Sequence, residues 1–163
     1  MKKRIIIFIL GALVVSVFLI RLFSKAHLDD VTPAIPCDEK LYDHAGILWV
    51  IPKFNSINIS DNPEWCKKIL ALNKTIGMHG VYHSYREFMT FRDEEYVNEG
   101  VEEFEKCFGF KPTLFKAPQD AYNKINKESM GGLHVVSYFE LVFHKEFHCN
   151  NEGVLPNWVF RIF

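Results

Sequence analysis

The chain has 163 residues, of which 48% are hydrophobic, and its formal net charge is −1. This length suits one domain. The balanced charge, without a basic stripe, argues against nucleic acid as a partner. We expect unpaired thiols, although an even number of cysteines permits disulfides outside the cytoplasm. No two cysteines have the C-x-x-C spacing of a zinc knuckle or a thioredoxin-type site; they are Cys37, Cys66, Cys107 and Cys149.

Residues 1–22 have the composition of a membrane-spanning segment. The run from Ile5 to Ile20 contains no charged residue, while three basic residues precede it and Arg21 follows it. At about 1.5 Å per residue, the stretch 5–23 is long enough to cross the hydrocarbon core of a bilayer. The larger basic cluster lies at the N-terminal side, which places that end in the cytoplasm and the rest of the chain outside.

This segment can be an uncleaved anchor or a cleaved signal peptide. Ser24-Lys25-Ala26 offers a small-x-small cleavage site, and cleavage there would give a secreted protein. The apolar run is longer than most signal sequences, and cleavage after Ala26 would leave Asp29 three residues from a free terminus. We therefore predict a single-pass membrane protein, with residues 23–163 as its extracytoplasmic domain.

Residues 23–163 are predicted to form an α/β domain, because short apolar strands alternate with amphipathic helices. The predicted strands are 23–30, 46–51, 75–79, 112–115 and 134–139. Predicted helices begin at Asn62-Pro63, cover 93–108, and run from Asp120 to Met130. The segment 141–163 is aromatic and β-prone, and its pairing stays open.

Polar side chains follow the ends of several predicted strands. Asp29 and Asp30 end the first strand, and His79 ends the third, with His83 four residues later. Lys116-Ala117-Pro118 follows the fourth strand. Because active sites of parallel α/β folds lie at the C-terminal ends of the strands, we expect these groups to meet.

Two imidazoles and one carboxylate are a plausible ligand set for a divalent metal, with one position left for water. Such a metal lowers the pKa of bound water from about 15.7 towards about 7. A second carboxylate could take the water's proton as it attacks a carbonyl, so hydrolysis of an amide or ester is the predicted chemistry. The His-x3-His spacing is weak evidence alone, since His144 and His148 repeat it.

Three motifs resemble the polysaccharide deacetylase family, in the family's order and rough spacing. They are Asp29-Asp30, His79-Gly-Val-Tyr-His83 and Phe115-Lys-Ala-Pro118. The divergent prokaryotic deacetylase-like branch is the most similar, since Glu87-Phe88 follows the histidine motif. The resemblance spans about 23–119, roughly three-fifths of the chain.

The resemblance implies a (β/α) barrel and metal-dependent removal of acetyl groups from a carbohydrate, with zinc as the expected metal. It implies Asp29 as the catalytic base. It also implies metal ligands at Asp30, His79 and His83, and a groove wall around Pro118. Tyr82 and Lys116 complete the predicted substrate-binding residues.

The chain also departs from the family pattern. Lys116 stands where the family usually has an arginine, and a lysine cannot make a bidentate clamp on the base. No late motif identifies the general acid, for which His148 is the preferred candidate and His144 the next. The C-terminal part is short for a full barrel, so we expect a reduced or distorted one.

Two alternatives to an active deacetylase of this family remain open. The first is a catalytically inactive protein of the same fold that binds carbohydrate or acts as a scaffold at the membrane. The second is a Rossmann-like de-N-acetylase with an Ala-His-x-Asp-Asp motif, which residues 26–30 fit. In that case His27 would be a metal ligand, so the direction of its ring distinguishes the two folds.

Overall fold

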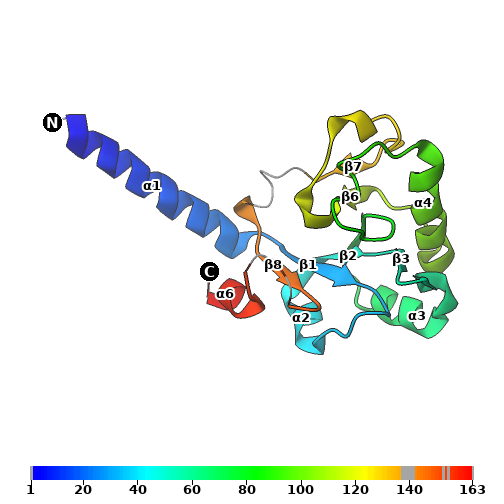
Figure 1. Ribbon diagram of the computed structural model, residues 1–163. Coiled ribbons are helices and arrows are strands. Elements are labelled where there is room, and N and C mark those ends of the chain that lie inside the picture. The colour runs from blue at the N-terminus through cyan, green and yellow to red at the C-terminus, as the bar shows by residue number, and fades with distance from the viewer. Residues whose placement is uncertain (1, 137–141, 152, 154, 163) are drawn as a thin grey trace.

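The computed structural model describes residues 2–136, 142–151, 153 and 155–162. Helix α1, Lys2–Phe23, extends away from an α/β domain that holds the rest of the described chain (Figure 1). Its span Lys3–Phe23 has a mean hydropathy of 2.9 and no buried residues. By length and composition α1 can cross a membrane, as a signal sequence also can.

A parallel sheet forms the centre of the domain, as the alternating pattern predicts. Its order is β7-β6-β5-β2-β1-β8, and every pairing in it is parallel. Among the described residues nothing joins β7 to β8, so the sheet is an open, reduced form of a barrel. The strands are β1 Ala26–Val31, β2 Ala45–Val50, β5 Thr75–His79, β6 Leu114–Lys116, β7 His134–Val135 and β8 Glu146–His148.

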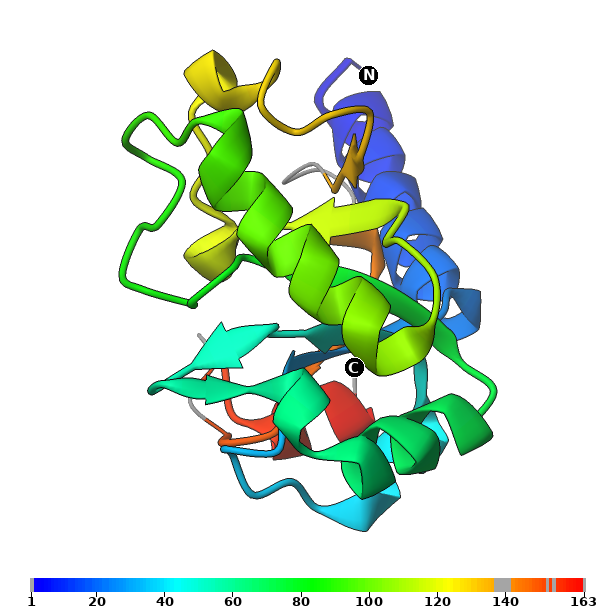
Figure 2. The same cartoon turned by 90° about the vertical axis from the view of Figure 1, so that its right-hand side faces the viewer.

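Helices α3 and α4 lie on the same side of this sheet (Figure 2). The predicted helix 93–108 is confirmed as α4. Asp93 caps it by accepting a hydrogen bond from the Tyr96 N–H, and Gly109 ends it with φ of 79°. Glycine can adopt this left-handed backbone conformation without steric cost, which is why it commonly ends helices. The helices of the domain are α2 Glu39–His44, α3 Pro63–Ala71, α4 Glu94–Phe108 and α6 Asn157–Ile162.

Several predicted elements need correction. The helix expected from Asp120 to Met130 is replaced by two short 3-10 turns, η2 Pro118–Asp120 and η3 Lys124–Asn126. The reason is local, because Asn123 accepts a hydrogen bond from the Ile125 N–H and so favours a turn. The predicted strand 134–139 is observed as β7, and residues 137–141 lie outside the described residues.

Three short elements were not predicted. They are helix α2, the 3-10 turn η1 Ile59–Asp61, and an antiparallel hairpin of β3 Lys53–Phe54 with β4 Ile57–Asn58. Each is too short to show a clear hydrophobic period in the sequence.

The expectation of unpaired cysteines is wrong. Cys37 bonds to Cys149, and Cys66 bonds to Cys107. The partners are 112 and 41 residues apart in the sequence, so only the folded chain brings them together. One disulfide ties the segment after β8 to the loop after β1, and the other ties α3 to α4.

The core packs between the sheet and helices α3 and α4. Each fully buried apolar side chain contributes about 1.5–3 kcal/mol. A side chain at Gly77 would bring a Cβ within 2.4 Å of the Trp49 ring, so β5 needs glycine to pass this indole. Residues with no exposed area include Leu28, Leu48, Ile69, Met78, Phe104 and Phe115.

Candidate metal centre

A bulge in β1 turns two consecutive carboxylates towards the same cavity. Leu28 pairs with Leu48 and Val31 with Val50, so β1 has one more residue than β2 across this interval. Asp30 adopts a positive φ of 61° at the bulge. In a regular strand, neighbouring side chains point to opposite faces. The extra residue cancels that alternation, and both Asp29 and Asp30 line the cavity.

His79 ends β5 with its ring fixed in one orientation. Its Nδ1 lies 3.1 Å from the backbone oxygen of Lys116, to which a ring N–H donates, so Nε2 is left with its lone pair. This Nε2 is 3.7 Å from Asp30 Oδ1 and also 3.7 Å from Asp29 Oδ2. His83 Nε2 lies 3.0 Å from Asp30 Oδ1, on the other side. One carboxylate oxygen thus faces two imidazole nitrogens.

A buried glutamate shapes the loop 80–83 that carries the second histidine. The Glu87 carboxylate accepts hydrogen bonds from the backbone N–H groups of Val81, Tyr82 and His83 at 2.9–3.3 Å, and from a tyrosine hydroxyl. His83 itself has a positive φ of 58°. A Cβ at Gly80 would lie 2.3 Å from Glu87 Oε2, so the glycine of the motif makes room for the carboxylate.

Strand β8 adds two groups from far along the chain. Asp29 pairs with His148 in the β1–β8 register, and Glu146 lies two residues earlier on the same strand. His148 Nδ1 is 3.1 Å from Asp30 Oδ2, and its Nε2 is 3.6 Å from Glu146 Oε1. The structure therefore places the His148 ring between the Asp30 and Glu146 carboxylates.

The other candidate for the late histidine lies elsewhere. His144 Nδ1 is 3.0 Å from the backbone oxygen of Lys25, and its ring stacks on His27 at 4.6 Å. The His27 ring also contacts Trp49, at 5.6 Å. His27 belongs to neither group of described residues that could hold a metal. The ring direction required by the Ala-His-x-Asp-Asp alternative is therefore not observed.

Lys116 lies beneath the cavity floor and bridges two carboxylates. Its Nζ is 2.5 Å from Asp29 Oδ2, 2.5 Å from Glu146 Oε1 and 3.7 Å from Asp120 Oδ1. Burial disfavours the ammonium, yet these carboxylates raise the pKa of Lys116 above its usual range. It touches one oxygen of Asp29, as expected of a lysine in place of a bidentate arginine.

Burial and neighbouring side chains determine the charges of His79 and Asp30. Burial, reinforced by the nearby His83, lowers the pKa of His79 well below its usual range. Burial opposes ionisation of Asp30, but hydrogen bonds from His148 and His83 lower its pKa below the usual range. The site therefore combines a neutral His79 with an ionised Asp30, which are the forms that bind metals.

One group of side chains fits a divalent cation. Ligand atoms of Asp30, His79 and His83 all lie within 4.8 Å of one another. Asp30 Oδ1 is buried and faces the His83 and His79 imidazole nitrogens at 3.0 and 3.7 Å, and no other hydrogen-bond donor among the described residues satisfies it. A second group comprises Asp29, Glu146 and His148, but the Lys116 ammonium already lies 2.5 Å from each of its two carboxylates.

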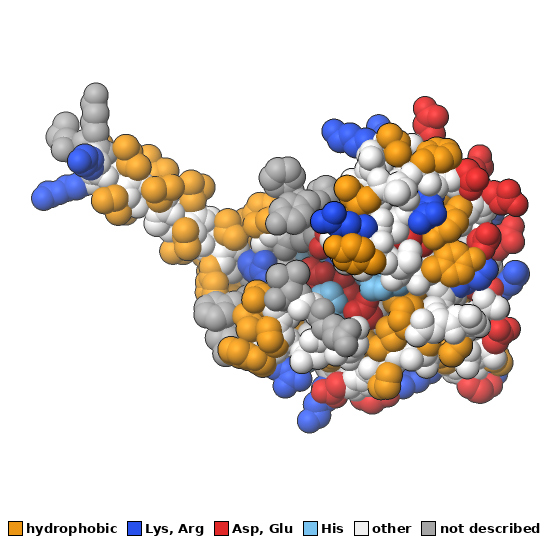
Figure 3. Space-filling view, in the orientation of Figure 1, with side chains coloured by type: hydrophobic (Ala, Val, Ile, Leu, Met, Phe, Trp, Pro, Cys, Tyr) orange, Lys and Arg blue, Asp and Glu red, His pale blue; other side chains and the backbone are white. Residues whose placement is uncertain are grey.

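The cavity measures about 280 Å³. Acidic and histidine side chains show in a hollow on the face of the molecule drawn in Figure 3. The lining residues include the five predicted as catalytic or metal-binding, namely Asp29, Asp30, His79, His83 and His148. The sequence-based predictions did not include the other six lining residues, Gln119, Asp120, Glu146, Asn150, Gly153 and Phe160. Only Glu146 had a usable signal, because it lies at strand spacing from His148.

The predicted substrate-binding residues do not line this cavity. Lys116 has 1% exposure. Pro118 is buried beside Gly80, at 2.6 Å from a Cβ placed there. The Tyr82 hydroxyl donates to Glu99 on α4, and Lys53 lies 5.0 Å above its ring. Tyr82 thus faces α4 and the hairpin.

No model of a known protein family matches the sequence, and no curated protein matches it either. Solved structures with a similar fold include a peptidoglycan deacetylase and pseudoenzymes of the CE4 family. This is the family whose motifs the sequence resembles.

Among these structures is a mutant of the peptidoglycan deacetylase PdaC from Bacillus subtilis. It has 19% identity and a TM-score of 0.49, and the match covers 70% of this chain and 58% of that one. A CE4 family pseudoenzyme from Bacillus anthracis, BA3943, has 12% identity and a TM-score of 0.44, with coverage of 63% and 44%. A deacetylase solved with substrate has 22% identity and a TM-score of 0.40, with coverage of 51% and 40%.

The chain thus spans between 40% and 58% of the length of these three structures. At these identities and TM-scores the likeness concerns the fold, and no activity follows from it.

Proposed function

We propose that this chain is a metal-dependent hydrolase that removes acetyl groups from a carbohydrate. The observation that carries the proposal is the convergence of Asp30, His79 and His83 beside a further carboxylate, Asp29. These three side chains would hold the divalent cation, for which imidazole and carboxylate ligands favour zinc. The motif resemblance supports an acetylated carbohydrate as the substrate.

A bound divalent cation would supply a Lewis acid for the acetyl carbonyl and lower the pKa of a nearby water. Asp29 would act as the base. Its Oδ2 is held by Lys116 at 2.5 Å, while its buried Oδ1 makes no hydrogen bond among the described residues. This acceptor without a partner supports the proposed role, in which Asp29 Oδ1 would accept the proton of the attacking water.

His148 would act as the general acid. It lines the cavity opposite the two imidazoles and is oriented by Asp30 through Nδ1. The side-chain amide of Asn157 brackets its backbone, accepting from the His148 N–H at 2.9 Å and donating to its carbonyl at 2.7 Å. A histidine held in this way can hand a proton to the amine or alcohol that leaves.

We further propose that residues 1–22 anchor the protein and that residues 23–163 form the deacetylase-like domain outside the cytoplasm. The two disulfides support a location outside the cytoplasm, because such bonds persist in oxidising compartments. Strand β1 begins three residues after α1 ends. The site thus stays close to the membrane surface, where an acetylated glycan of the cell envelope would reach it.

Metal content tests the proposal directly. The full chain, purified in detergent, should carry a stoichiometric divalent metal, and Asp30→Ala or His79→Ala should lose it. His44→Ala, an exposed histidine at the end of α2, is the matched control and should keep it. A wild-type chain without stoichiometric metal would rule the proposal out.

Acetate release separates catalysis from metal binding. Asp29→Asn should keep the metal and release acetate from acetylated chito-oligosaccharides about 10²–10⁴-fold more slowly than wild type. If the wild type binds both metal and oligosaccharide but releases no acetate, the inactive carbohydrate-binding or scaffold protein is the better description.

A further inference from the structure

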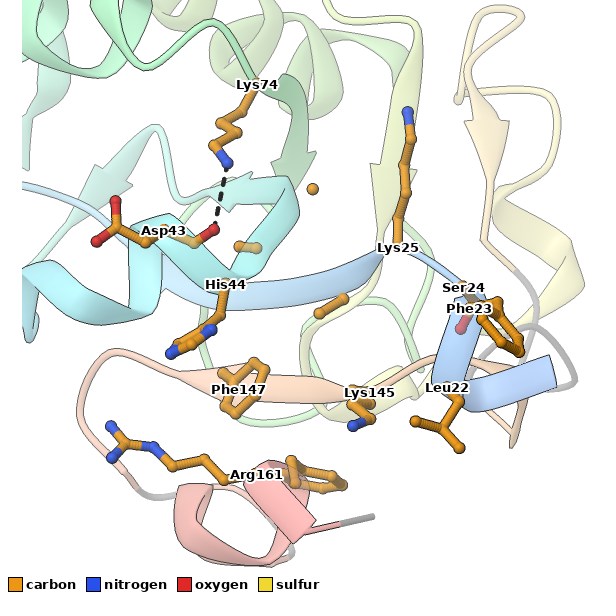
Figure 4. Close-up of a pocket in the computed structure, with 14 residues that line it drawn as sticks. Leu22, Phe23, Ser24, Lys25, Asp43, His44, Lys74, Lys145, Phe147 and Arg161 are labelled. Carbon is orange, nitrogen blue, oxygen red and sulfur yellow. Dashed lines mark hydrogen bonds between the residues drawn. The ribbon is translucent and has the colours of Figure 1, made fainter. Parts of the chain in front are cut away.

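A second cavity, of about 570 Å³, opens where α1 joins the domain. We call it the helix-end cavity. It lies at the N-terminal ends of β1 and β2, whereas the metal centre lies at the C-terminal end of β1. Figure 4 shows its lining drawn from the end of α1, the end of α2, β8 and α6. The proposed hydrolase uses none of these side chains, although Phe160 lines both cavities.

One part of the lining is apolar and another is cationic. Leu22 and Phe23 come from the last turn of α1, and aromatic rings of β8 and α6 continue this apolar wall. Lys145 lies between Phe147 and Leu22 in the view of Figure 4. The cationic residues of the lining are Lys25, Lys74, Lys145 and Arg161, against a single carboxylate, Asp43.

The described chain leaves these cations largely uncompensated. Lys25 and Lys145 form no ion pair with any described residue, and Lys74 reaches only the backbone oxygen of Asp43, at 3.5 Å. Arg161 lies 3.8 Å from Asp38, and both side chains are about half exposed. An exposed pair at this distance is weak. The cavity therefore has room and charge for an anion.

The place of the cavity indicates which kind of anion. The apolar surface of α1 ends at Phe23, which is 87% exposed, and the cavity begins at the same residues. With α1 across a bilayer, this end of the helix lies at the level of the lipid headgroups. An amphiphile can then lay its acyl chain along α1 while its phosphate meets Lys145, which lies beside Leu22 in Figure 4.

We propose that the helix-end cavity binds the phosphate headgroup of an anionic phospholipid, with Lys145, which lies beside Leu22 at the end of α1, as its main contact. This site is independent of the proposed deacetylase activity and depends only on α1 remaining in the bilayer. Its consequence is mechanical, because a bound headgroup holds the domain against the membrane in a fixed orientation.

Lipid selectivity provides the test. The full chain is reconstituted into phosphatidylcholine bilayers containing a trace of spin-labelled phosphatidylglycerol or spin-labelled phosphatidylcholine. The fraction of label immobilised by the protein should be larger for phosphatidylglycerol, and the selectivity should fall about fivefold for Lys145→Glu. Arg161→Glu should reduce it less, because the Arg161 guanidinium lies on the far side of Phe147 from Lys145 in Figure 4. Lys106→Glu and Lys111→Glu make the same charge change at the end of α4, away from the cavity, and should leave the selectivity intact.

Three outcomes overturn the proposal. They are equal immobilisation of the two lipids by the wild type, an equal loss in the cavity variants and the control variants, and displacement of the labelled lipid by inorganic phosphate alone. The last would identify a site for soluble phosphate. Lys145→Met, which removes the charge without adding a carboxylate, guards against misfolding of the Glu variants and should also reduce the selectivity.

Discussion

Lys116 joins three strands through one buried charge. It extends from β6 to the Asp29 carboxylate on β1 and the Glu146 carboxylate on β8. A buried ammonium is tolerated only when carboxylates compensate it. Asp29 is therefore oriented by Lys116, and only part of this contact could be predicted from the sequence. The lysine was visible after its strand, but its second partner lies 30 residues further along the chain.

His27 makes the stability of the domain depend on pH. Burial, helped by the Lys116 and His144 charges, lowers the pKa of His27 to about 3. Below about pH 6.5 the unfolded chain binds a proton here that the folded chain does not, so stability is lost on acidification. The loss at this residue between about pH 7 and about pH 5 should be about 2 kcal/mol.

The variant His27→Phe isolates this contribution. The Nδ1 of His27 makes no hydrogen bond within the described part of the chain, so phenylalanine removes the titration without removing a described partner. Urea unfolding with the disulfides intact should show a smaller loss on acidification for His27→Phe than for wild type. Parallel curves for the two proteins would mean that His27 is protonated in the folded state.

At the scale of elements, the loop 80–83 depends on Glu87 for its conformation. Glutamine at this position keeps one acceptor oxygen where the carboxylate has two, and it lacks the charge that holds three backbone N–H groups. Glu87→Gln should shift His83 and weaken the affinity for the divalent metal by about 10–100-fold. Competition against a chelator measures this affinity.

Glu103→Gln is the matched control for that experiment. Glu103 is also a buried carboxylate that accepts a backbone hydrogen bond, from the Ser60 N–H at 2.8 Å, but it lies on α4 outside the cavity. It should lower stability and leave metal affinity unchanged. If both variants bind metal like the wild type, the loop does not need Glu87.

The two disulfides should differ in what they support. Removing either bond costs about 2–5 kcal/mol of stability. Cys149 directly follows His148, so Cys37→Ser with Cys149→Ser should also slow acetate release by loosening β8. The Cys66–Cys107 bond joins only α3 to α4. The double variant Cys66→Ser with Cys107→Ser should therefore leave turnover per folded molecule unchanged. Equal turnover in both double variants would contradict this division.

At the scale of the molecule, α1 should keep the domain on the membrane. The intact mass of the purified chain should include residues 1–22, and alkaline carbonate should not extract the protein from membranes. Leu13→Lys places a charge in the middle of α1, at a cost of about 2.5–3.5 kcal/mol for insertion. Alkaline carbonate should therefore extract part of this variant from the membrane. Phe91→Lys changes an exposed apolar residue of the domain and serves as the control. A mature chain beginning after Ala26 would show that α1 is a signal peptide.

Regular periods explain which parts of the fold could be predicted. Strand β5 and helix α4 follow hydrophobic patterns that extend over five and fifteen residues, and both lie within two residues of the predicted bounds. The turns after Pro118 could not be predicted in this way. There, positive φ angles at Gln119 and Asp120 override the helical signal of the residues that follow.

The sequence by itself determined the apolar helix, the alternation of strands and helices, and the presence of Asp29, Asp30 and His79 near strand ends, with His83 four residues after the last of them. Those features depend on neighbours along the chain, whose spacing fixes the face or end on which a side chain lies. Only the tertiary structure decided the cysteine pairing, the partners of Lys116, and the arrival of β8 beside β1. These contacts join residues that are far apart in the sequence. A local hydrophobic pattern cannot indicate which distant strand will pair with β1.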